Sequence, residues 1–333
     1  MYDNILETAV NTPLVRLTQV CGGLPFSLYA KLEAFNPGGS IKDRPAFDII
    51  RNGVSRGEIV PGMTVVESSS GNMGIGLAQA CAYYGLRFIC VIDPKTTRQN
   101  LSILSAYGAE LDLVTTPDPE TGEFLQARLK RVRHLLDSHP DSFWPNQYSN
   151  LDNPAAHFKT MREISRELGS QVDYLFCATS TCGTVRGCAE YIAENGMPTR
   201  LIAVDAVGSV LFLGQSGKRL IPGHGAGVIP QLYREGMEDR CIKVTDLDSV
   251  VGCRRLVMKE SILVGGSSGA VLSAFGQIRD EIPAGSNCVL IFPDRGERYL
   301  DTIYSNDWVK EHFGDVSHLW KEAETPVAVE HVY

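Results

Sequence analysis

The most informative segment of this chain is Asn36-Pro37-Gly38-Gly39-Ser40-Ile41-Lys42-Asp43-Arg44-Pro45-Ala46. Pro37 and the glycine pair predict a turn, and the apolar residues that follow Ser40 recur at helical spacing. Lys42 therefore falls in the first turn of a predicted helix. A cation opposes the positive end of the helix dipole, so this position should lower the pKa of the lysine amine and favour its neutral form.

A neutral lysine amine is a nucleophile that can form a Schiff base with an aldehyde cofactor. The alternative is a surface lysine that pairs with Asp43 at the start of the helix. This stretch alone favours neither interpretation, so the other motifs of the chain must decide between them.

The composition is that of an ordinary globular protein, with 333 residues, 44% of them hydrophobic and 21% charged, enough for two domains. A net charge of -8 without a basic stretch argues against nucleic acid or an anionic membrane as partner. No apolar run has membrane-spanning length, and the acidic segment 1–8 does not resemble a leader, so we expect a cytoplasmic protein. Nine scattered cysteines predict free thiols, and no histidine or cysteine spacing predicts a metal site.

Strands and helices alternate along the chain, as they do in proteins built on parallel sheets. We expect strands at 14–17, 27–32, 64–67, 88–92, 110–114, 174–178, 200–204, 241–244 and 288–292. We expect helices after Lys42 to about 52, and at 75–84, 97–107, 123–138, 155–168, 185–195, 247–260 and 270–279. Two doubly wound lobes with ligand loops at the carboxyl ends of their strands place a site in the cleft between them. The chain beyond Phe313 is expected to be a loosely held tail.

Two loops offer hydrogen-bond donors to an anion. The loop from Thr181 to Thr184 precedes a predicted helix, so its amides, its two hydroxyls and the helix dipole could hold a phosphate, although a capped helix start has the same pattern. The loop from Ser69 to Asn72 offers donors to a carboxylate, and its alternative is a serine-capped turn. The glycines of 71–76 lack the spacing of a dinucleotide fingerprint, which argues against a nicotinamide cofactor.

A second possible chemistry is hydrolysis. The segment Gly265-Gly266-Ser267-Ser268-Gly269 has the Gly-x-Ser-x-Gly pattern of the α/β hydrolases between a strand and a helix. Asp294 and His318 even follow Ser267 in the chain order of a hydrolase triad. This interpretation leaves the Lys42 stretch and both anion loops unused, and His318 falls in the expected tail. It is therefore the remote alternative.

Further motifs stand in order along the chain: Asn11-Thr12-Pro13-Leu14, Lys31-Leu32-Glu33, Ser69-Ser70-Gly71-Asn72, Asn146-Gln147-Tyr148, Thr181 to Thr184, Gly266-Ser267-Ser268-Gly269 and Gly296-Glu297-Arg298-Tyr299. With the Lys42 stretch, they resemble the cysteine synthase and cystathionine β-synthase family over about 12–307. These are β-replacing pyridoxal 5'-phosphate enzymes of the tryptophan synthase β-like α/β fold, fold type II. The resemblance implies a homodimer whose large cofactor-binding domain is 1–38 and 150–315, whose small mobile substrate-binding domain is 39–149, and whose tail is 316–333.

The resemblance also implies roles for single residues. Lys42 would be the Schiff-base lysine, Asn72 the partner of the phenolic oxygen of the cofactor, and Ser267 the partner of its pyridine nitrogen. The loop Ser180, Thr181, Cys182, Gly183 and Thr184 would hold the cofactor phosphate. The substrate carboxylate would be held by Ser69, Ser70, Gly71 and Asn72, together with Gln147. We expect the catalytic residues to be Lys42, Tyr148 and Ser180.

The chain departs from ordinary cysteine synthases at Met73, Tyr148, Cys182 and Pro293-Asp294-Arg295. These departures resemble a branch of the family that serves assembly of the siderophore staphyloferrin B. That branch joins O-phospho-L-serine to L-glutamate and so supplies a precursor of L-2,3-diaminopropionate. The alternative within the family is a cysteine synthase that uses O-phosphoserine or O-acetylserine and sulfide.

Such substrates carry much negative charge, which requires local cations in an acidic chain. Arg128 and Arg295 are the candidates for the leaving phosphate or the glutamate carboxylates, because a guanidinium can bind either through two hydrogen bonds. The alternative for Arg128 is a place on the solvent face of its amphipathic helix. Tyr148 could position the incoming amine, or it could be a core residue. Arg44 is expected to be a structural ion-pair residue.

Overall fold

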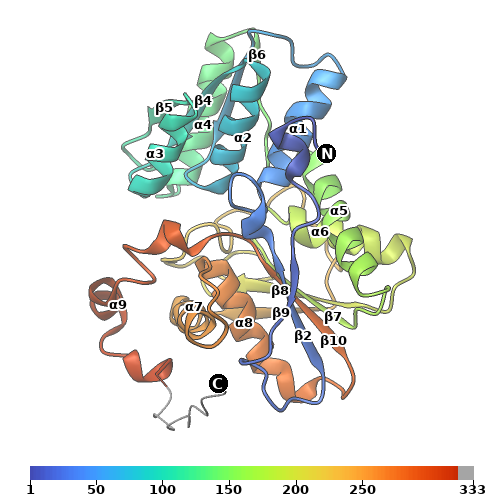
Figure 1. The fold of residues 1–333 in the computed structure, drawn as a ribbon. Helices are drawn as coiled ribbons and strands as arrows, with labels where there is room; N and C mark the ends of the chain where they lie inside the picture. Colours follow the sequence, from blue (N-terminus) through green and yellow to red (C-terminus); the bar gives the residue numbers. More distant parts are fainter. Residues whose placement is uncertain (322–333) are drawn as a thin grey trace, which may run out of the picture.

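A six-stranded sheet forms the larger half of the protein in the computed structural model, which describes residues 1–321 (Figure 1). Its strands lie in the order β1-β2-β10-β7-β8-β9, and all neighbours are parallel except β1 and β2. The strands are β1 Leu14–Arg16, β2 Ser27–Leu32, β7 Tyr174–Ala178, β8 Arg200–Ala206, β9 Arg240–Val244 and β10 Asn287–Phe292.

Helices cover both faces of this sheet, because neighbouring residues of its buried strands point to opposite sides. Phe176 of β7 belongs to the core beneath α7 (Asp246–Glu260) and α8 (Gly266–Ile278). Its neighbour Leu175 belongs to the core beneath α5 (Asp152–Glu167) and α6 (Gly183–Glu194). The strands of this sheet are therefore continuous apolar runs, in which apolar and polar residues do not alternate.

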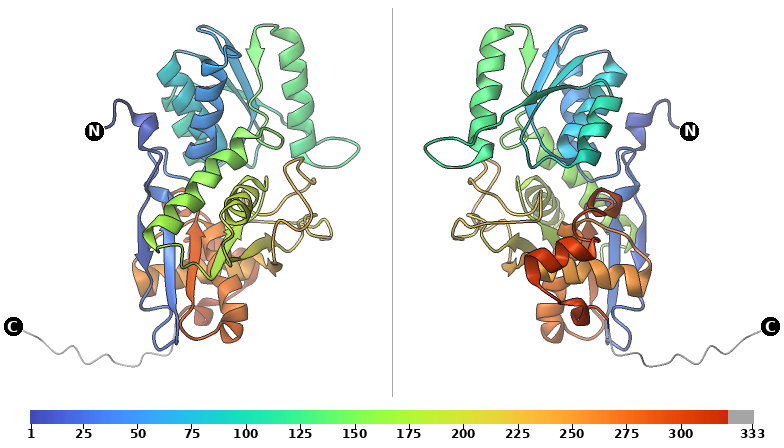
Figure 2. Two further views of the ribbon diagram at one scale, coloured as in Figure 1. Left: turned by 90° about the vertical axis from the view of Figure 1, so that its right-hand side faces the viewer. Right: turned by 90° about the vertical axis from the view of Figure 1, so that its left-hand side faces the viewer.

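A four-stranded parallel sheet forms the smaller half, in the order β5-β4-β3-β6. Val65 of β3 packs in the core with α1 and α2, whereas Val66 packs in the core with α4, and Figure 2 shows α4 on the far side of the sheet from α1 and α2. The elements are α1 Asp43–Ser55, β3 Thr64–Ser68, α2 Asn72–Tyr84, β4 Arg87–Ile92, α3 Arg98–Ala106, β5 Glu110–Leu113, α4 Phe124–Ser138 and β6 Ser142–Phe143.

The C-terminal part of the described chain packs onto the large sheet and its helices. Val316, Leu319 and Trp320 lie against the core beneath α7 and α8, so residues 314–321 are not the loosely held tail that we expected. Residues 322–333 of that expected tail lie outside the described residues. The remaining helical segments are α9 Asn306–Phe313 and the 3-10 helices Ile5–Thr8, Glu33–Phe35, Arg279–Glu281, Gly296–Tyr299 and Ser317–Leu319.

The nine expected strands and eight expected helices are all present, with shifted ends. The two-residue strand β6 and helix α9 were not predicted. α2 begins at Asn72 and α8 at Gly266, because serine- and glycine-rich segments that we interpreted as loops already form the first helical turns. Among residues 1–321, no helix is both long enough and apolar enough to span a membrane.

Candidate active site

A cavity of about 300 Å³ lies at the carboxyl ends of β3, β4, β7 and β10, so both sheets contribute to its walls. Strand carboxyl ends are where parallel α/β proteins bind ligands, because the loops that follow the strands meet there. Most of the residues predicted for the site line this cavity: Lys42, Ser69, Ser70, Gly71, Asn72, Arg128, Gln147, Tyr148, Ser180, Thr181, Cys182, Gly183, Thr184 and Ser267.

Lys42 stands at the start of α1, as the residue that caps the helix immediately before Asp43. Burial lowers the pKa of its amine to about 8, and Asp294 and Cys182 partly oppose that shift. The sequence predicted the direction of this pKa shift from the helix dipole, whereas desolvation is its main cause in the structure. The amine is therefore neutral in a substantial fraction of molecules near pH 8.

Hydrogen bonds hold the loop before Lys42 to the start of α1 and to the residue after β10. The Asp43 carboxylate accepts a hydrogen bond from the Gly38 amide at 2.7 Å, and the Ile41 amide donates to the Pro293 carbonyl at 2.7 Å. Gly39 has φ +85°, a left-handed conformation that favours glycine. These contacts fix the backbone that carries Lys42 against the end of β10.

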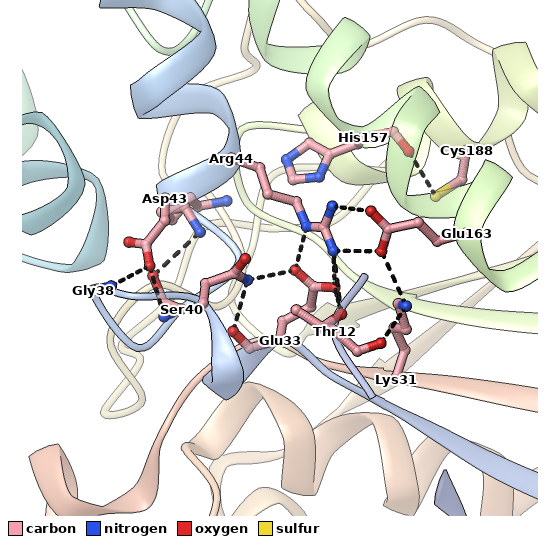
Figure 3. A network of polar contacts seen from close by, with 12 residues as sticks. Thr12, Lys31, Glu33, Gly38, Ser40, Asp43, Arg44, His157, Glu163 and Cys188 are labelled. Carbon is pink, nitrogen blue, oxygen red and sulfur yellow. Dashed lines mark hydrogen bonds and ion pairs between the residues drawn. The ribbon is translucent and has the colours of Figure 1, made fainter. Parts of the chain in front are cut away.

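A buried ion network anchors α1 from below (Figure 3). Arg44 pairs with Glu33 at 2.7 Å and with Glu163 of α5 at 2.8 Å, and Lys31 of β2 pairs with Glu163 at 3.0 Å. The hydroxyl of Thr12 donates to Glu33 at 2.8 Å. Arg44 is therefore a structural residue, as predicted, and it joins the helix that begins beside Lys42 to the large sheet.

The first turn of α6, where the sequence predicts an anion site, lines the cavity. Cys182 precedes the helix with φ +66°, and the first amides of a helix have no acceptor within it. A side chain at Gly183 would collide with Asn153 of α5, so only glycine lets α6 begin this close to α5. The amides of this turn and the positive end of the helix dipole face the cavity and suit a phosphate.

Asn72 lies opposite this turn in a polar network. Its Nδ2 donates to Asp294 at 2.7 Å, its Oδ1 accepts from Arg298, and the Tyr299 hydroxyl donates to Asp294 at 2.6 Å. Burial raises the pKa of Asp294, and the bonds from Tyr299 and Asn72 partly oppose that shift. Sequence reasoning missed Arg298 as a lining residue, although it belongs to the quoted motif 296–299.

The two candidate arginines have different positions. Arg128 of α4 is buried and lines the cavity, so the solvent-facing alternative is wrong. Its Nε lies 3.2 Å from Asp93 Oδ2, but within residues 1–321 neither Nε nor Nη1 has a hydrogen-bond partner of good geometry. Arg295 is exposed, its Nε donates to the Ala34 carbonyl at 2.9 Å, and the structure does not bring it to the cavity.

Tyr148 faces the same part of the cavity as Arg128. Burial raises the pKa of its hydroxyl, which nearby Arg128 and Arg219 lower in part, so the phenol is neutral and can donate a hydrogen bond. Arg219 comes from the long loop between β8 and β9, and the sequence did not single it out. Gln147 donates to the Ser68 carbonyl at 3.2 Å, which places its amide beside the carboxylate loop 69–72.

The described chain contains no Ser-Asp-His triad of the kind that the hydrolase alternative requires. Ser267 lines the cavity in the first turn of α8, but His318 lies in the 3-10 helix Ser317–Leu319, away from the cavity. Asp294 accepts hydrogen bonds from Tyr299 and Asn72, and no histidine of residues 1–321 bonds to it. Ser267 therefore lacks the relay that would make it a nucleophile.

Pyridoxal phosphate requires an amine for its aldehyde, a cradle for its phosphate and a partner for its ring nitrogen. The cavity places the enclosed amine of Lys42, the open first turn of α6 and the hydroxyl of Ser267 around one space. The residues present therefore fit this cofactor.

Comparisons with known proteins agree with this fit. A family model described as "Pyridoxal-phosphate dependent enzyme" matches residues 5–294. An N-(2-amino-2-carboxyethyl)-L-glutamate synthase from Ralstonia nicotianae is 45% identical over 307 residues, which cover 92% of this chain and 90% of that protein. A synthase of the same name from Cupriavidus metallidurans is 43% identical over 311 residues, covering 92% and 91%.

Solved structures support the same conclusion. The crystal structure of an O-acetylserine dependent cystathionine beta-synthase from Helicobacter pylori has a TM-score of 0.85 with this chain at 33% identity, covering 92% of this chain and 99% of that one. The family match and this likeness confirm the predicted fold type II and the predicted cofactor. The chain is a member of the pyridoxal-phosphate dependent enzyme family.

Proposed function

We propose that the protein catalyses a β-replacement that joins O-phospho-L-serine and L-glutamate into N-(2-amino-2-carboxyethyl)-L-glutamate and releases phosphate. The names of the two synthases, at 43–45% identity, support the product. The observation in the structure that carries the proposal is the buried guanidinium of Arg128, which lines the Lys42 cavity, pairs with Asp93 through Nε at 3.2 Å, and leaves Nη1 without a hydrogen-bond partner in the described chain. A guanidinium suits the phosphate of O-phospho-L-serine and has no such partner in O-acetyl-L-serine, so Arg128 supports the phosphorylated donor, and the names of the two synthases support the acceptor.

Bound pyridoxal phosphate supplies an electron-withdrawing ring that stabilises negative charge at Cα of an amino acid. In the proposed reaction Lys42 removes the Cα proton and the Cβ–O bond to phosphate breaks. The glutamate nitrogen then forms the new bond to Cβ with loss of a proton, and Lys42 returns a proton to Cα. The first turn of α6 holds the cofactor phosphate, Asn72 binds the cofactor's phenolic oxygen, and Ser267 faces its ring nitrogen. The hydroxyl of Ser267 does not enforce protonation of that nitrogen as a carboxylate would, which favours elimination at Cβ.

The substrate roles follow the same walls of the cavity. The donors of 69–72 and the amide of Gln147 hold the carboxylate of O-phospho-L-serine. Arg128 binds the leaving phosphate, and Tyr148 and Ser180 position the reacting groups. Arg295 has no part in this proposal, because its guanidinium lies outside the cavity.

The proposal also covers the domain division, the cellular setting and the use of the product. Residues 39–149 act as the small mobile domain, which is supported by the cavity's position between the two sheets. The protein is a cytoplasmic homodimer, and the nine free cysteines are consistent with a reducing compartment. Its product serves siderophore assembly, which the departures from ordinary cysteine synthases support.

The test supplies the purified, cofactor-loaded protein with O-phospho-L-serine and either L-glutamate or sulfide. We expect the amino-linked adduct and one equivalent of phosphate with L-glutamate, measured by mass spectrometry and phosphate release. Formation of cysteine from sulfide, with no adduct from L-glutamate, would show that the protein is a cysteine synthase. A protein that shows no visible absorbance after addition of pyridoxal phosphate would exclude both functions.

Arg128→Leu should raise the KM for O-phospho-L-serine about 10- to 100-fold, because a charge-assisted hydrogen bond to phosphate is lost. O-acetyl-L-serine has no phosphate, so its KM should change little in the same variant. Arg131→Leu is the matched control, since Arg131 lies one turn further along α4 and pairs with Asp112 instead. Equal losses with both serine esters would contradict a phosphate role for Arg128.

Loading of the cofactor should depend on pH through the Lys42 amine. With a pKa of about 8, the neutral fraction rises about fivefold between pH 7 and pH 8 and levels off above pH 9. The rate at which visible absorbance appears on mixing cofactor-free protein with pyridoxal phosphate measures this. A rate that keeps rising tenfold per pH unit to pH 10 would mean an unperturbed lysine.

A further inference from the structure

Two charged residues of the cavity lining that the proposed roles do not use lie close to Gly227. They are Arg219, from the loop between β8 and β9, and Glu123, immediately before α4. One comes from each half of the protein. Within residues 1–321 neither side chain forms an ion pair, although both line the same cavity.

The loop positions Arg219 firmly. The amides of Leu220 and Ile221, the next two residues, donate to the Asp246 carboxylate at 2.9 and 3.2 Å. Nε of Arg219 is buried and has no hydrogen-bond partner in the described chain, and Nη1 has only a long contact of 3.5 Å to the His224 carbonyl. A guanidinium in such a place retains donors for a ligand, and its backbone is fixed before the ligand arrives.

Two glycines of the same loop leave room for the guanidinium group of Arg219. A Cβ at Gly225 would lie 3.0 Å from Nη1, and one at Gly227 would lie 3.3 Å from Nη2. The Cβ at Gly227 would also lie 4.0 Å from the carboxyl carbon of Glu123. Arg219 and Glu123 therefore flank one glycine, so a positive and a negative group stand close together without pairing.

Tyr148 connects this pair to the reaction centre. Its carbonyl accepts a hydrogen bond from the Leu232 amide of the same loop at 3.1 Å, and Arg219 and Arg128 both act electrostatically on its hydroxyl. Arg128 and Arg219 thus both lie near this phenol in the cavity. With Arg128 assigned to the leaving phosphate and Arg298 bonded to Asn72 and to the Gly38 carbonyl, Arg219 and Glu123 are the candidates for the second substrate.

We propose that Arg219 and Glu123 form the subsite for the acceptor amino acid, Arg219 binding one of its carboxylates and Glu123 accepting the proton that its ammonium group loses before the nitrogen bonds to Cβ. A guanidinium and a carboxylate side by side are complementary to the zwitterionic head of an amino acid. The subsite explains how a cavity that eliminates phosphate selects an amine over sulfide. This inference rests on the proposed β-replacement.

The test separates the two halves of the reaction. The absorbance change on adding O-phospho-L-serine alone reports the first half, and its reversal by an acceptor reports the second. In Arg219→Leu we expect the first half within twofold of the wild type and the KM for L-glutamate raised 10- to 100-fold, with Arg219→Lys between them. Glu123→Gln should raise the same KM, and reversal by sulfide should be unchanged in all three variants.

Lys218→Leu is the matched control, because Lys218 precedes Arg219, carries the same charge and does not line the cavity. Circular dichroism establishes that each variant is folded. A KM for L-glutamate within twofold of the wild type in Arg219→Leu would overturn the subsite, as would equal losses with sulfide and L-glutamate. A wild-type protein that accepts sulfide but no amino acid would overturn the proposed function and the subsite together.

Discussion

Lys42→Ala should have no measurable activity with O-phospho-L-serine and L-glutamate, a loss of at least about four orders of magnitude. The variant loses the amine that binds the cofactor and the base that removes the Cα proton, and no other lysine of the described chain except exposed Lys95 lines the cavity. The visible absorbance band of the loaded protein should also be absent. Product formation by mass spectrometry and an absorbance spectrum measure both effects.

Two further variants sharpen this result. Lys42→Arg keeps the positive charge and most of the volume, but a guanidinium stays protonated, so it should be as inactive as Lys42→Ala. Lys130→Ala removes an exposed lysine of α4 that pairs with Asp118, and it should keep full activity. Appreciable turnover by Lys42→Arg would show that a positive charge, rather than a neutral amine, is required at this position.

Arg44→Met should destabilise the protein by about 3–5 kcal/mol. The replacement leaves Glu33 buried without an ion-pair partner and leaves Glu163 with Lys31 alone, and an unpaired buried charge is costly. Because this network holds the start of α1, the variant should also bind pyridoxal phosphate more weakly. The midpoint of urea-induced unfolding, followed by circular dichroism without cofactor, measures the stability change.

The control for Arg44 is Arg56→Met at the other end of α1. Arg56 pairs with Glu58 and Asp152 on the surface, where water solvates the partners once the arginine is gone. The unfolding midpoint should therefore hardly change. A similar loss in both variants would mean that α1 depends on its arginines for reasons other than the buried network.

The sequence was most informative where residues follow a regular period. Alternating apolar strands and amphipathic helices gave nearly every element of both sheets, and the motif around Lys42 gave the lysine and the direction of its pKa shift. The sequence left a solvent-facing Arg128 open, because the amphipathic pattern of α4 shows which face is polar but not what covers that face. In the structure the cavity lies there, so a charged side chain on that face is buried.

The rest could not be predicted for reasons of geometry. Arg295 and Arg298 stand three residues apart around a four-residue 3-10 helix, which is too short for a periodic pattern to show which of them faces the cavity. Arg219 lies in an irregular loop, where no period exists at all. Its position depends on the contacts of its neighbours with Asp246, which a single sequence does not reveal.

The strand order has a consequence for synthesis on the ribosome. β2, near the N-terminus, pairs with β10, the last strand within residues 1–321, whereas the whole small sheet is encoded between β2 and β7. The small sheet can therefore complete itself while the nascent chain is still growing. β2 must wait with an unpaired edge until almost the entire protein has emerged, which makes the N-terminal strand the segment of the nascent chain that most needs protection by a chaperone.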